Sequence, residues 1–422
     1  MKVYSDSNED GIPSRPEHGR KPRILAAVTA HSSTGFFRGQ LAYLRANGFD
    51  VTLLSAPGHV ATNVAMANGV EHIGIEMKRH PAPMADIVAL LRIIAAIRTY
   101  RPDIISAGTP KAGLLLMLAG WICRIPCRVY MLRGLRLETA TGMRRRALAL
   151  LERLCCTLAH YVVCVSPSLR QRMLDYGLAP ANKLTVIGKG SSNGVDLARF
   201  SRNADIARRA SRIRSVLEIP ASATVVGFVG RLTHDKGIHV LAAAWRELRE
   251  RYPDLYLVLV GGVEERDGAA QRTAGTLKRD PRARVIGRVE DIVPYYALMD
   301  ILVLPTLREG FPNVVLEAAA MGLPVVTTTA TGSRDSVLPG LTGGLVEPGD
   351  PTALSHAISR YVDDPAMRER HGRAGREMVE THFRQEHVWD GMVKYYWQIL
   401  NKGGVEAATK KGDVSYDTHG CM

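Results

Sequence analysis

The sequence predicts an α/β protein of two domains, each built on a parallel sheet with helices on both faces. The 422 residues are 46% hydrophobic and 23% charged, which is the composition of a globular protein long enough for more than one core. Short β-branched runs alternate with longer helical stretches, and this alternation begins again in the second half. Such alternation indicates parallel strands joined by helical crossovers. Composition excludes a disordered chain, a collagen and a small disulfide-rich protein.

The first half begins its regular pattern at Arg23 and is interpreted as a Rossmann-like domain. We expect strands at 23–28, 50–54, 71–75, 103–106, 128–132 and 161–165. We expect helices near 36–47, 85–100, 111–123, 142–158 and 167–176.

The second half repeats the pattern. We expect strands at 224–230, 254–261, 283–287, 300–305, 323–328 and 343–347, and helices near 237–251, 269–279, 291–298, 313–321 and 351–363. The predicted division is a flexible leader 1–22, a first domain 23–195 with a returning helix 385–400, a second domain 196–384 and a flexible tail 401–422. Ligands of such sheets bind beyond the carboxyl ends of the strands, so we expect a site in a cleft between the domains.

The positive charge of the chain lies in its first half. The net charge is +14, with 27 basic and 13 acidic residues in 1–203 and 28 of each in 204–422. Nucleic acid, an anionic membrane or a phosphorylated substrate would each suit this excess. Aromatic residues are only 6% and no nucleic-acid-reading motif occurs, so we expect no nucleic-acid partner. The leader has no apolar segment and the six cysteines have no disulfide-like spacing, which predicts a cytoplasmic protein.

The first turn expected to carry chemistry is Gly230–Gly237 (GRLTHDKG), between a strand and a helix. Gly230 permits close backbone approach, and Arg231 and Lys236 place two cations beside a helix N-terminus. Together they suit a diphosphate. The alternative interpretation is that both are solvated residues at a helix start.

The second such turn is Glu309–Glu317 (EGFPNVVLE), where two carboxylates are eight positions apart. Glu309 would meet a sugar hydroxyl, and Glu317, farther along the same side, would meet a ribose. The intervening loop, Gly310, Phe311, Pro312 and Asn313, would bind phosphate oxygens through its backbone N–H groups. Pro312 has no N–H group of its own. The alternative is that both glutamates only keep a helix soluble.

With these two turns the chain resembles a family-four glycosyltransferase of the GT-B fold. The segments TPKAG (109–113), LRGLRLET (132–139) and GKGSSNGVDLARF (188–200) are similar to bacterial members that build capsule, exopolysaccharide or O-antigen units on a lipid carrier. The resemblance implies retaining transfer from a nucleotide sugar, UDP-linked, to a polyprenyl-diphosphate-linked saccharide. It also implies no divalent metal and no other cofactor, in agreement with the absence of a D-x-D triplet.

The resemblance also assigns roles to residues. Arg231, Lys236 and Glu309 are the expected catalytic residues, and Gly35, in the loop after the first strand, is expected beside the diphosphate. Family members carry a histidine after the fourth strand that touches the donor sugar, whereas this chain has none there, so we expect Thr109 or Lys111 in that place. The expected nucleotide-sugar-binding residues are Gly35, Gly230, Arg231, Lys236, Glu309, Gly310, Phe311, Pro312, Asn313 and Glu317.

Residues 142–158 (GMRRRALALLERLCCTL) form a basic amphipathic pattern. With Arg133, Arg136, Lys78 and Arg79 this helix would dock the first domain on the inner face of the plasma membrane, as a peripheral protein. The alternative is a helix packed on the sheet with its arginines in water.

One further pattern in the sequence resembles a catalytic motif. The G-x-S-x-G pattern at 190–194 is interpreted as a hinge and not a nucleophile elbow, because a turn and not a helix follows it. Two alternatives to glycosyl transfer remain, a nucleotide-sugar epimerase and a non-catalytic, basic polysaccharide-binding protein. The pattern predicts no oligomeric state.

Overall fold

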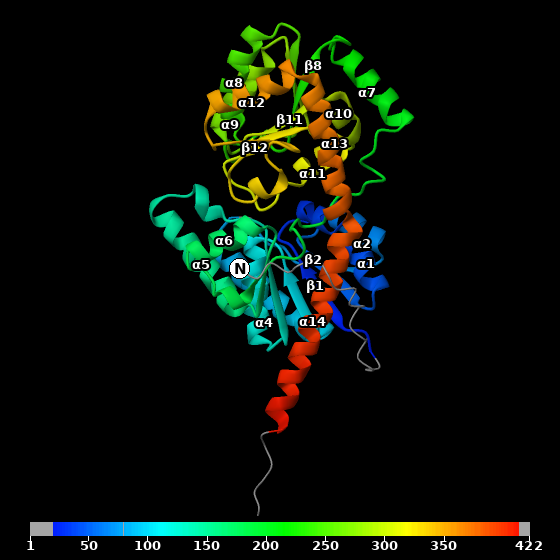
Figure 1. The fold of residues 1–422 in the computed structure, drawn as a ribbon. Helices are drawn as coiled ribbons and strands as arrows, with labels where there is room; N and C mark the ends of the chain where they lie inside the picture. Colours follow the sequence, from blue (N-terminus) through cyan, green and yellow to red (C-terminus); the bar gives the residue numbers. More distant parts are fainter. Residues whose placement is uncertain (1–19, 79, 413–422) are drawn as a thin grey trace, which may run out of the picture. The chain divides into compact units, whose positions relative to one another are not determined.

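Two parallel β-sheets with helices on both faces form the protein, which confirms the predicted α/β class (Figure 1). A computed structural model describes residues 20–78 and 80–412. The chain divides into a first unit, Met1–Met131, Leu154–Val162 and Trp389–Met422, and a second unit, Leu132–Arg153 and Val163–Val388. Most of the predicted leader, Arg79 and the last ten residues of the predicted tail lie outside the described residues.

The first sheet is doubly wound, with the strand order β3-β2-β1-β4-β5-β6-β7. Its strands are β1 (Arg23–Ala27), β2 (Asp50–Ser55), β3 (Glu71–Gly74), β4 (Ile104–Ala107), β5 (Cys127–Leu132), β6 (Tyr161–Cys164) and β7 (Leu184–Thr185). The core strands β1 and β4 are almost entirely buried, as expected for parallel strands covered on both faces. The predicted boundary between residues 195 and 196 stays a prediction, because β7 belongs to this sheet while its residues belong to the second unit.

Within the described residues the first half of the chain has nine helical elements, of which three, at 59–68, 136–139 and 181–183, lie outside the predicted helix ranges. They are η1 (His31–Phe37), α1 (Gln40–Ala46), α2 (His59–Asn68), α3 (Pro83–Tyr100), α4 (Pro110–Ile122), η2 (Arg136–Thr139), α5 (Gly142–Leu158), α6 (Pro167–Asp175) and η3 (Ala181–Lys183). The helix expected at 36–47 is interrupted at Gly39, which has a left-handed backbone (φ +77°). An added Cβ at Gly39 would lie 2.6 Å from the ring of Trp389, so this position requires glycine.

The second sheet has the strand order β10-β9-β8-β11-β12-β13. Its strands are β8 (Thr224–Val229), β9 (Leu255–Val260), β10 (Ala283–Gly287), β11 (Ile301–Leu304), β12 (Val325–Thr328) and β13 (Gly343–Val346). The order reverses between β8 and β11, so the carboxyl ends of these two strands form the switch point where ligands of doubly wound sheets bind.

Helices cover both faces of the second sheet (Figure 1). They are α7 (Ala204–Val216), η4 (His234–Lys236), α8 (Ile238–Arg251), α9 (Gly268–Lys278), α10 (Val293–Leu298), α11 (Asn313–Ala320), η5 (Arg334–Ser336), α12 (Pro351–Asp363) and α13 (Pro365–His382). On one face α8 packs against α9 and α12, and on the other α11 packs against α13 and α7 against α10.

The last helix, α14 (Gln385–Gly412), extends twelve residues beyond its predicted end, and its packing confirms the return to the first domain. The Trp397 ring lies 4.6 Å from that of Phe49, and the hydroxyl of Tyr396 donates to the hydroxyl oxygen of Ser106 at 3.0 Å. Trp389, Tyr396 and Trp397 are all buried. These aromatic residues are therefore core residues, as the sequence predicts, and not a sugar-binding platform.

Most of the apolar side of helix α5 is exposed. The alternative interpretation of residues 142–158, a helix packed on the sheet with its arginines in water, is therefore wrong. Cys155 and Cys156 are the only buried residues of α5, while Met143 is 77% and Leu150 62% exposed. Among the described residues, no helix has the length and apolarity needed to cross a membrane.

Candidate functional site

The two turns singled out in the sequence leave the adjacent strands β8 and β11 at the switch point of the second sheet. In the first turn, the hydroxyl oxygen of Thr233 accepts from the Lys236 amide at 3.3 Å and caps η4. Asp267, which caps α9, also accepts from the His234 amide at 2.7 Å. Burial acts to raise the pKa of Asp267, but its hydrogen bonds with Ala270 and His234 lower it below the usual value. The turn is thus fixed at both ends.

Close backbone contact joins the first turn to the second. The Leu307 amide donates to the Asp235 carbonyl at 2.8 Å, and the Thr306 hydroxyl donates to the same oxygen at 3.0 Å. Gly237 has φ +73°, and an added Cβ there would lie 1.9 Å from the Pro305 carbonyl oxygen. Only glycine fits a left-handed position at this distance, so it permits the approach of the two turns.

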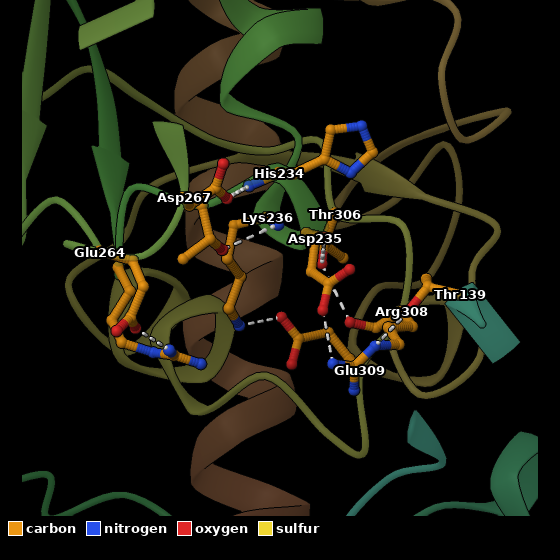
Figure 2. Close-up of polar contacts among 11 residues, drawn as sticks. Thr139, His234, Asp235, Lys236, Glu264, Asp267, Thr306, Arg308 and Glu309 are labelled. Carbon is orange, nitrogen blue, oxygen red and sulfur yellow. Dashed lines mark hydrogen bonds and ion pairs between the residues drawn. The ribbon is translucent and has the colours of Figure 1, made fainter. Parts of the chain in front are cut away.

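This approach brings together the charged side chains of both turns (Figure 2). The Lys236 ammonium donates to the Glu309 carboxylate, and the exposed fractions of these side chains are only 21% and 12%. Arg308 donates through Nη2 to Asp235 at 2.5 Å and through Nε to the Thr139 hydroxyl at 3.0 Å. A half-buried ion pair therefore lies at the centre of the site, with a second ion pair beside it.

Arg231, the other predicted cation, does not join this central pair. Its Nη1 donates to Glu264 Oε2 at 2.6 Å, and its side chain is 61% exposed. Gly230, which directly precedes Arg231, has φ +148°. Its carbonyl oxygen would lie 1.8 Å from a Cβ added at Gly261. Arg231 therefore lies at the exposed rim of the turn.

The loop after Glu309 is packed tightly against neighbouring backbone. A Cβ at Gly310 would lie 2.2 Å from the Arg133 carbonyl oxygen, and a Cβ at Gly332 would lie 2.1 Å from the carbonyl oxygen of Gly310. Phe311 is buried, with its ring 5.4 Å from that of Phe383. The loop conformation is therefore fixed by contacts on several sides.

The amides of this loop are available to a ligand. Among the residues that the structure describes, no acceptor is found for the amides of Gly310, Phe311 and Asn313. Asn313 is the first residue of α11, Pro312 is its N-cap residue, and the buried Oδ1 of Asn313 has no hydrogen-bond partner in the described structure. Unpaired amides at the start of a helix attract anions.

Glu317 lies on α11, whereas Glu309 lies in the loop before that helix, so helical spacing does not relate the two carboxylates. Oε2 of Glu317 accepts from the hydroxyl of Tyr296 at 2.8 Å. Burial raises the pKa of Tyr296 well above its usual value, and the Glu317 carboxylate adds to this effect. Tyr296 therefore stays protonated and neutral, and its hydroxyl donates the hydrogen bond that holds Glu317.

A third carboxylate, Glu138, was not predicted from the sequence. It accepts from the Thr331 hydroxyl at 2.5 Å and pairs with Arg172 at 3.3 Å. Burial raises the pKa of Glu138 above its usual value, although Thr331 and Arg172 act in the opposite direction. Its contacts come from remote segments, so no local motif could have identified it; its only signal was its place in LRGLRLET.

Three predicted residues belong to the first unit. Gly35 lies in η1, and a Cβ added there would meet no atom within 4 Å. The Thr109 hydroxyl oxygen accepts from the Thr29 amide at 2.8 Å, and Lys111 donates to Asp86 at 2.7 Å. Donor contacts for Gly35, Thr109 and Lys111 therefore stay predictions.

The segment 190–194 ends without a helix, since the next helix, α7, begins at Ala204. This confirms that it is not a nucleophile elbow. In the described part of the chain, no group of three or more His, Cys, Asp or Glu side chains is placed to hold a metal ion.

Two doubly wound sheets, with charged turns at a switch point, define the GT-B class of glycosyltransferases. Two families match the chain: "Glycosyl transferase 4-like domain" over residues 36–190 and "Glycosyl transferases group 1" over residues 223–364. The capsular polysaccharide biosynthesis glycosyltransferase CapM of Staphylococcus aureus is 34% identical over 383 residues, which are 91% of this chain and 99% of CapM. The chain therefore belongs to the group 1 glycosyltransferases, and the resemblance seen in its two turns is confirmed.

Two further proteins are similar. The UDP-Gal:alpha-D-GlcNAc-diphosphoundecaprenol alpha-1,3-galactosyltransferase of Escherichia coli is 25% identical over 68% of this chain and 74% of its own length. The crystal structure of Anabaena HepE in complex with UDP and glucose has a TM-score of 0.75 and 19% identity, over 89% of this chain and all of that one. The similarity to HepE shows a shared fold.

Proposed function

We propose that this glycosyltransferase moves a hexosyl or N-acetylhexosaminyl group, with retention, from a UDP-sugar to a polyprenyl-diphosphate-linked saccharide during synthesis of a capsule or related surface polysaccharide. The observation that carries the proposal is the meeting of Lys236 and Glu309 at the switch point of the second sheet. The names of the relatives support it, since CapM acts in capsule synthesis and the E. coli relative uses UDP-Gal and a diphosphoundecaprenol acceptor.

The donor would bind with its diphosphate between the two turns. Lys236 and Arg231 supply positive charge, and the unpaired amides of Gly310, Phe311 and Asn313 supply hydrogen-bond donors. Oxygens of a diphosphate accept from both kinds of group. The Glu309 carboxylate is an acceptor suited to a sugar hydroxyl, and Glu317 is one suited to a ribose hydroxyl.

Catalysis in this proposal is electrostatic. As the glycosidic bond breaks, negative charge grows on the leaving diphosphate, and Arg231 and Lys236 stabilise it. The acceptor hydroxyl attacks from the face that the diphosphate leaves, and the leaving phosphate oxygen takes its proton. We propose no divalent metal, because side-chain cations already occupy that role. Transfer that survives EDTA and is not raised by added Mg²⁺ or Mn²⁺ is the expected result.

The test is transfer from a panel of UDP-sugars to lipid-linked acceptors by variants of the central pair. Lys236→Ala and Glu309→Ala should each lower turnover by about 10²–10³, the loss typical when a charge-stabilising group is removed. Glu369→Ala is the matched control, because it removes a glutamate from an ion pair whose two side chains are both 70% exposed. Near-normal turnover in either central variant would show that the site is wrongly assigned.

The same assay separates the two alternative functions. An epimerase would convert a UDP-sugar in the absence of any acceptor, whereas a transferase needs one. A polysaccharide-binding protein would show no thermal shift with UDP. We expect a thermal shift with UDP and product formation only with a lipid-linked acceptor.

The acceptor's lipid would keep the enzyme at the inner face of the plasma membrane, with α5 as the docking element. Met143, Leu150, Leu151 and Leu154 are exposed by 77%, 62%, 43% and 43%. On the same helix the three consecutive arginines 144–146 are exposed. An apolar face beside basic residues is suited to an anionic membrane surface, where each basic residue contributes about 1 kcal/mol.

Flotation with vesicles tests the docking element. Wild-type protein should float with phosphatidylglycerol-containing vesicles and much less with phosphatidylcholine vesicles, and Leu150→Asp should abolish most of the binding. Val216→Asp is the matched control, since Val216 is 74% exposed on a different helix, α7. Equal flotation with anionic and neutral vesicles, or equal loss in both variants, would refute α5 docking.

A further inference from the structure

Arg136 lies beside the donor turns, which are the two turns proposed to bind the donor, Gly230–Gly237 and Glu309–Glu317. It opens η2, whose last residue, Thr139, accepts from Arg308 Nε at 3.0 Å. Arg308 in turn donates to Asp235 at 2.5 Å, in the first donor turn. Arg136 therefore lies one short helical turn from a residue that touches the donor site.

The surroundings of Arg136 are mainly positive. Arg136 is an exposed residue, yet partial loss of water around its guanidinium is the largest cause that lowers its pKa, and the charges of Arg308, Arg144 and Arg231 lower it further. Asp235 acts in the opposite direction. Like charges destabilise one another, so an anion bound beside Arg136 and Arg144 would be stabilised by both.

The donor turns differ from this region in how their charges are compensated. Arg231 pairs with Glu264, Lys236 with Glu309 and Arg308 with Asp235. The side chains of Arg136 and Arg144, by contrast, form no hydrogen bond or ion pair with any residue that the structure describes, and both residues are exposed. The uncompensated charge of the site is therefore on η2 and the first turn of α5.

We propose that Arg136 and Arg144 bind a second diphosphate, that of the lipid-linked acceptor, at a subsite distinct from that of the donor. The inference rests on the proposed function and names the acceptor group that this cluster recognises. Guanidinium groups bind phosphate oxygens in pairs and keep their charge when partly buried. The exposed leucines of α5 follow Arg144 on the same helix, so a diphosphate bound there would leave its lipid chain near the docking face.

The test is calorimetric titration of inorganic pyrophosphate into the protein saturated with UDP, which blocks the donor subsite. Arg136→Ala and Arg144→Ala should each weaken pyrophosphate binding at least fivefold and change the affinity for UDP less than twofold. Arg145→Ala is the control of equal charge, since Arg145 is next in sequence but lies 5.4 Å over the ring of Tyr176. It should change both affinities less than twofold.

Several outcomes would overturn the inference. They are the absence of pyrophosphate binding to the UDP-saturated protein, an equal loss in Arg145→Ala, and a large loss of UDP affinity in Arg136→Ala, which would assign this residue to the donor. If phospholipid headgroups were the ligand, Arg136→Ala would lower vesicle flotation more than Arg145→Ala does. A wild-type protein that fails to bind UDP refutes the proposed function alone, because titration without UDP still shows whether Arg136 binds a diphosphate.

Discussion

Replacing Gly237 with alanine tests whether close backbone contact holds the two charged turns together. Gly237 has φ +73°, and its added Cβ would lie 1.9 Å from the carbonyl oxygen of Pro305. An ordinary contact begins at 3.4 Å, so the two backbones would have to separate by more than 1 Å. The hydrogen bonds to the Asp235 carbonyl, from Thr306 and Leu307, cross the same junction and would be strained by that shift.

A matched glycine separates the two costs of this substitution. Gly322 has φ +74° and no atom within 4 Å of an added Cβ, so Gly322→Ala carries only the cost of a left-handed alanine. That cost is about 1–2 kcal/mol. Gly237→Ala adds the cost of overpacking, about 1–3 kcal/mol. We therefore expect Gly237→Ala to lower the free energy of unfolding by about 2–5 kcal/mol.

Urea denaturation followed by circular dichroism measures both variants, and calorimetry measures their affinity for UDP. Gly237→Ala should be less stable than Gly322→Ala by the overpacking cost and should bind UDP at least tenfold more weakly, because Lys236 precedes the substituted residue. Gly322→Ala should bind UDP normally. Equal stability of the two variants, with UDP binding intact in both, would refute the reasoning.

Three other predictions follow from single contacts. Tyr296→Phe removes the hydrogen bond to Glu317 and should weaken UDP binding severalfold while leaving pyrophosphate binding unchanged, as calorimetry would show. Glu138→Gln should raise the melting temperature at pH 7–8 and not at pH 4. The pKa of Glu138 is raised in the folded protein, so its ionised carboxylate lowers stability once the pH exceeds that pKa, and glutamine removes this cost. The exposed Glu369→Gln should show no such difference. Trp397→Ala should lower the free energy of unfolding by about 3–5 kcal/mol in chemical denaturation, since Trp397 is a buried core residue.

The sequence pattern predicted the strands well and missed helices that bury few large side chains. All six strands expected in the second half are present, and four of them, β8, β9, β11 and β12, are runs of mostly buried β-branched and aliphatic residues. Helix α7 buries only Ile206 and Ala210, so its apolar period was too weak to detect. Helix α13 contains two glycines, which favour other structures in a sequence, yet a Cβ at Gly372 would lie 2.1 Å from the Gly322 carbonyl oxygen. Those glycines serve close packing, a property that no local pattern shows.

The residue types of the two turns could be recognised in the sequence, but the pairs that their side chains form could not. The types of residue in the two turns suggested a diphosphate and a sugar, and the structure places both turns at one switch point. The pairing of Lys236 with Glu309 depends on strand order, because β8 and β11 are neighbours only after two other strands have been placed on the far side of β8. Glu264, which pairs with Arg231, follows β9 and carried no motif at all.

The two cations proposed to bind the donor, Arg231 and Lys236, are each paired with a carboxylate of the protein, and this bears on how the charge distribution is interpreted. The second half has no net charge, yet it contains the turns proposed to bind an anionic donor. Lys236 is only 21% exposed, and a carboxylate partner lowers the cost of keeping such a cation in the folded protein. A diphosphate entering this site would repel Glu309 and attract Lys236, and Glu309 would then be free to accept from a sugar hydroxyl. Neutrality before binding is therefore compatible with anion recognition. Among the described residues, the side chains of Arg136 and Arg144 have no such carboxylate partner, and we assign their charge to the second diphosphate.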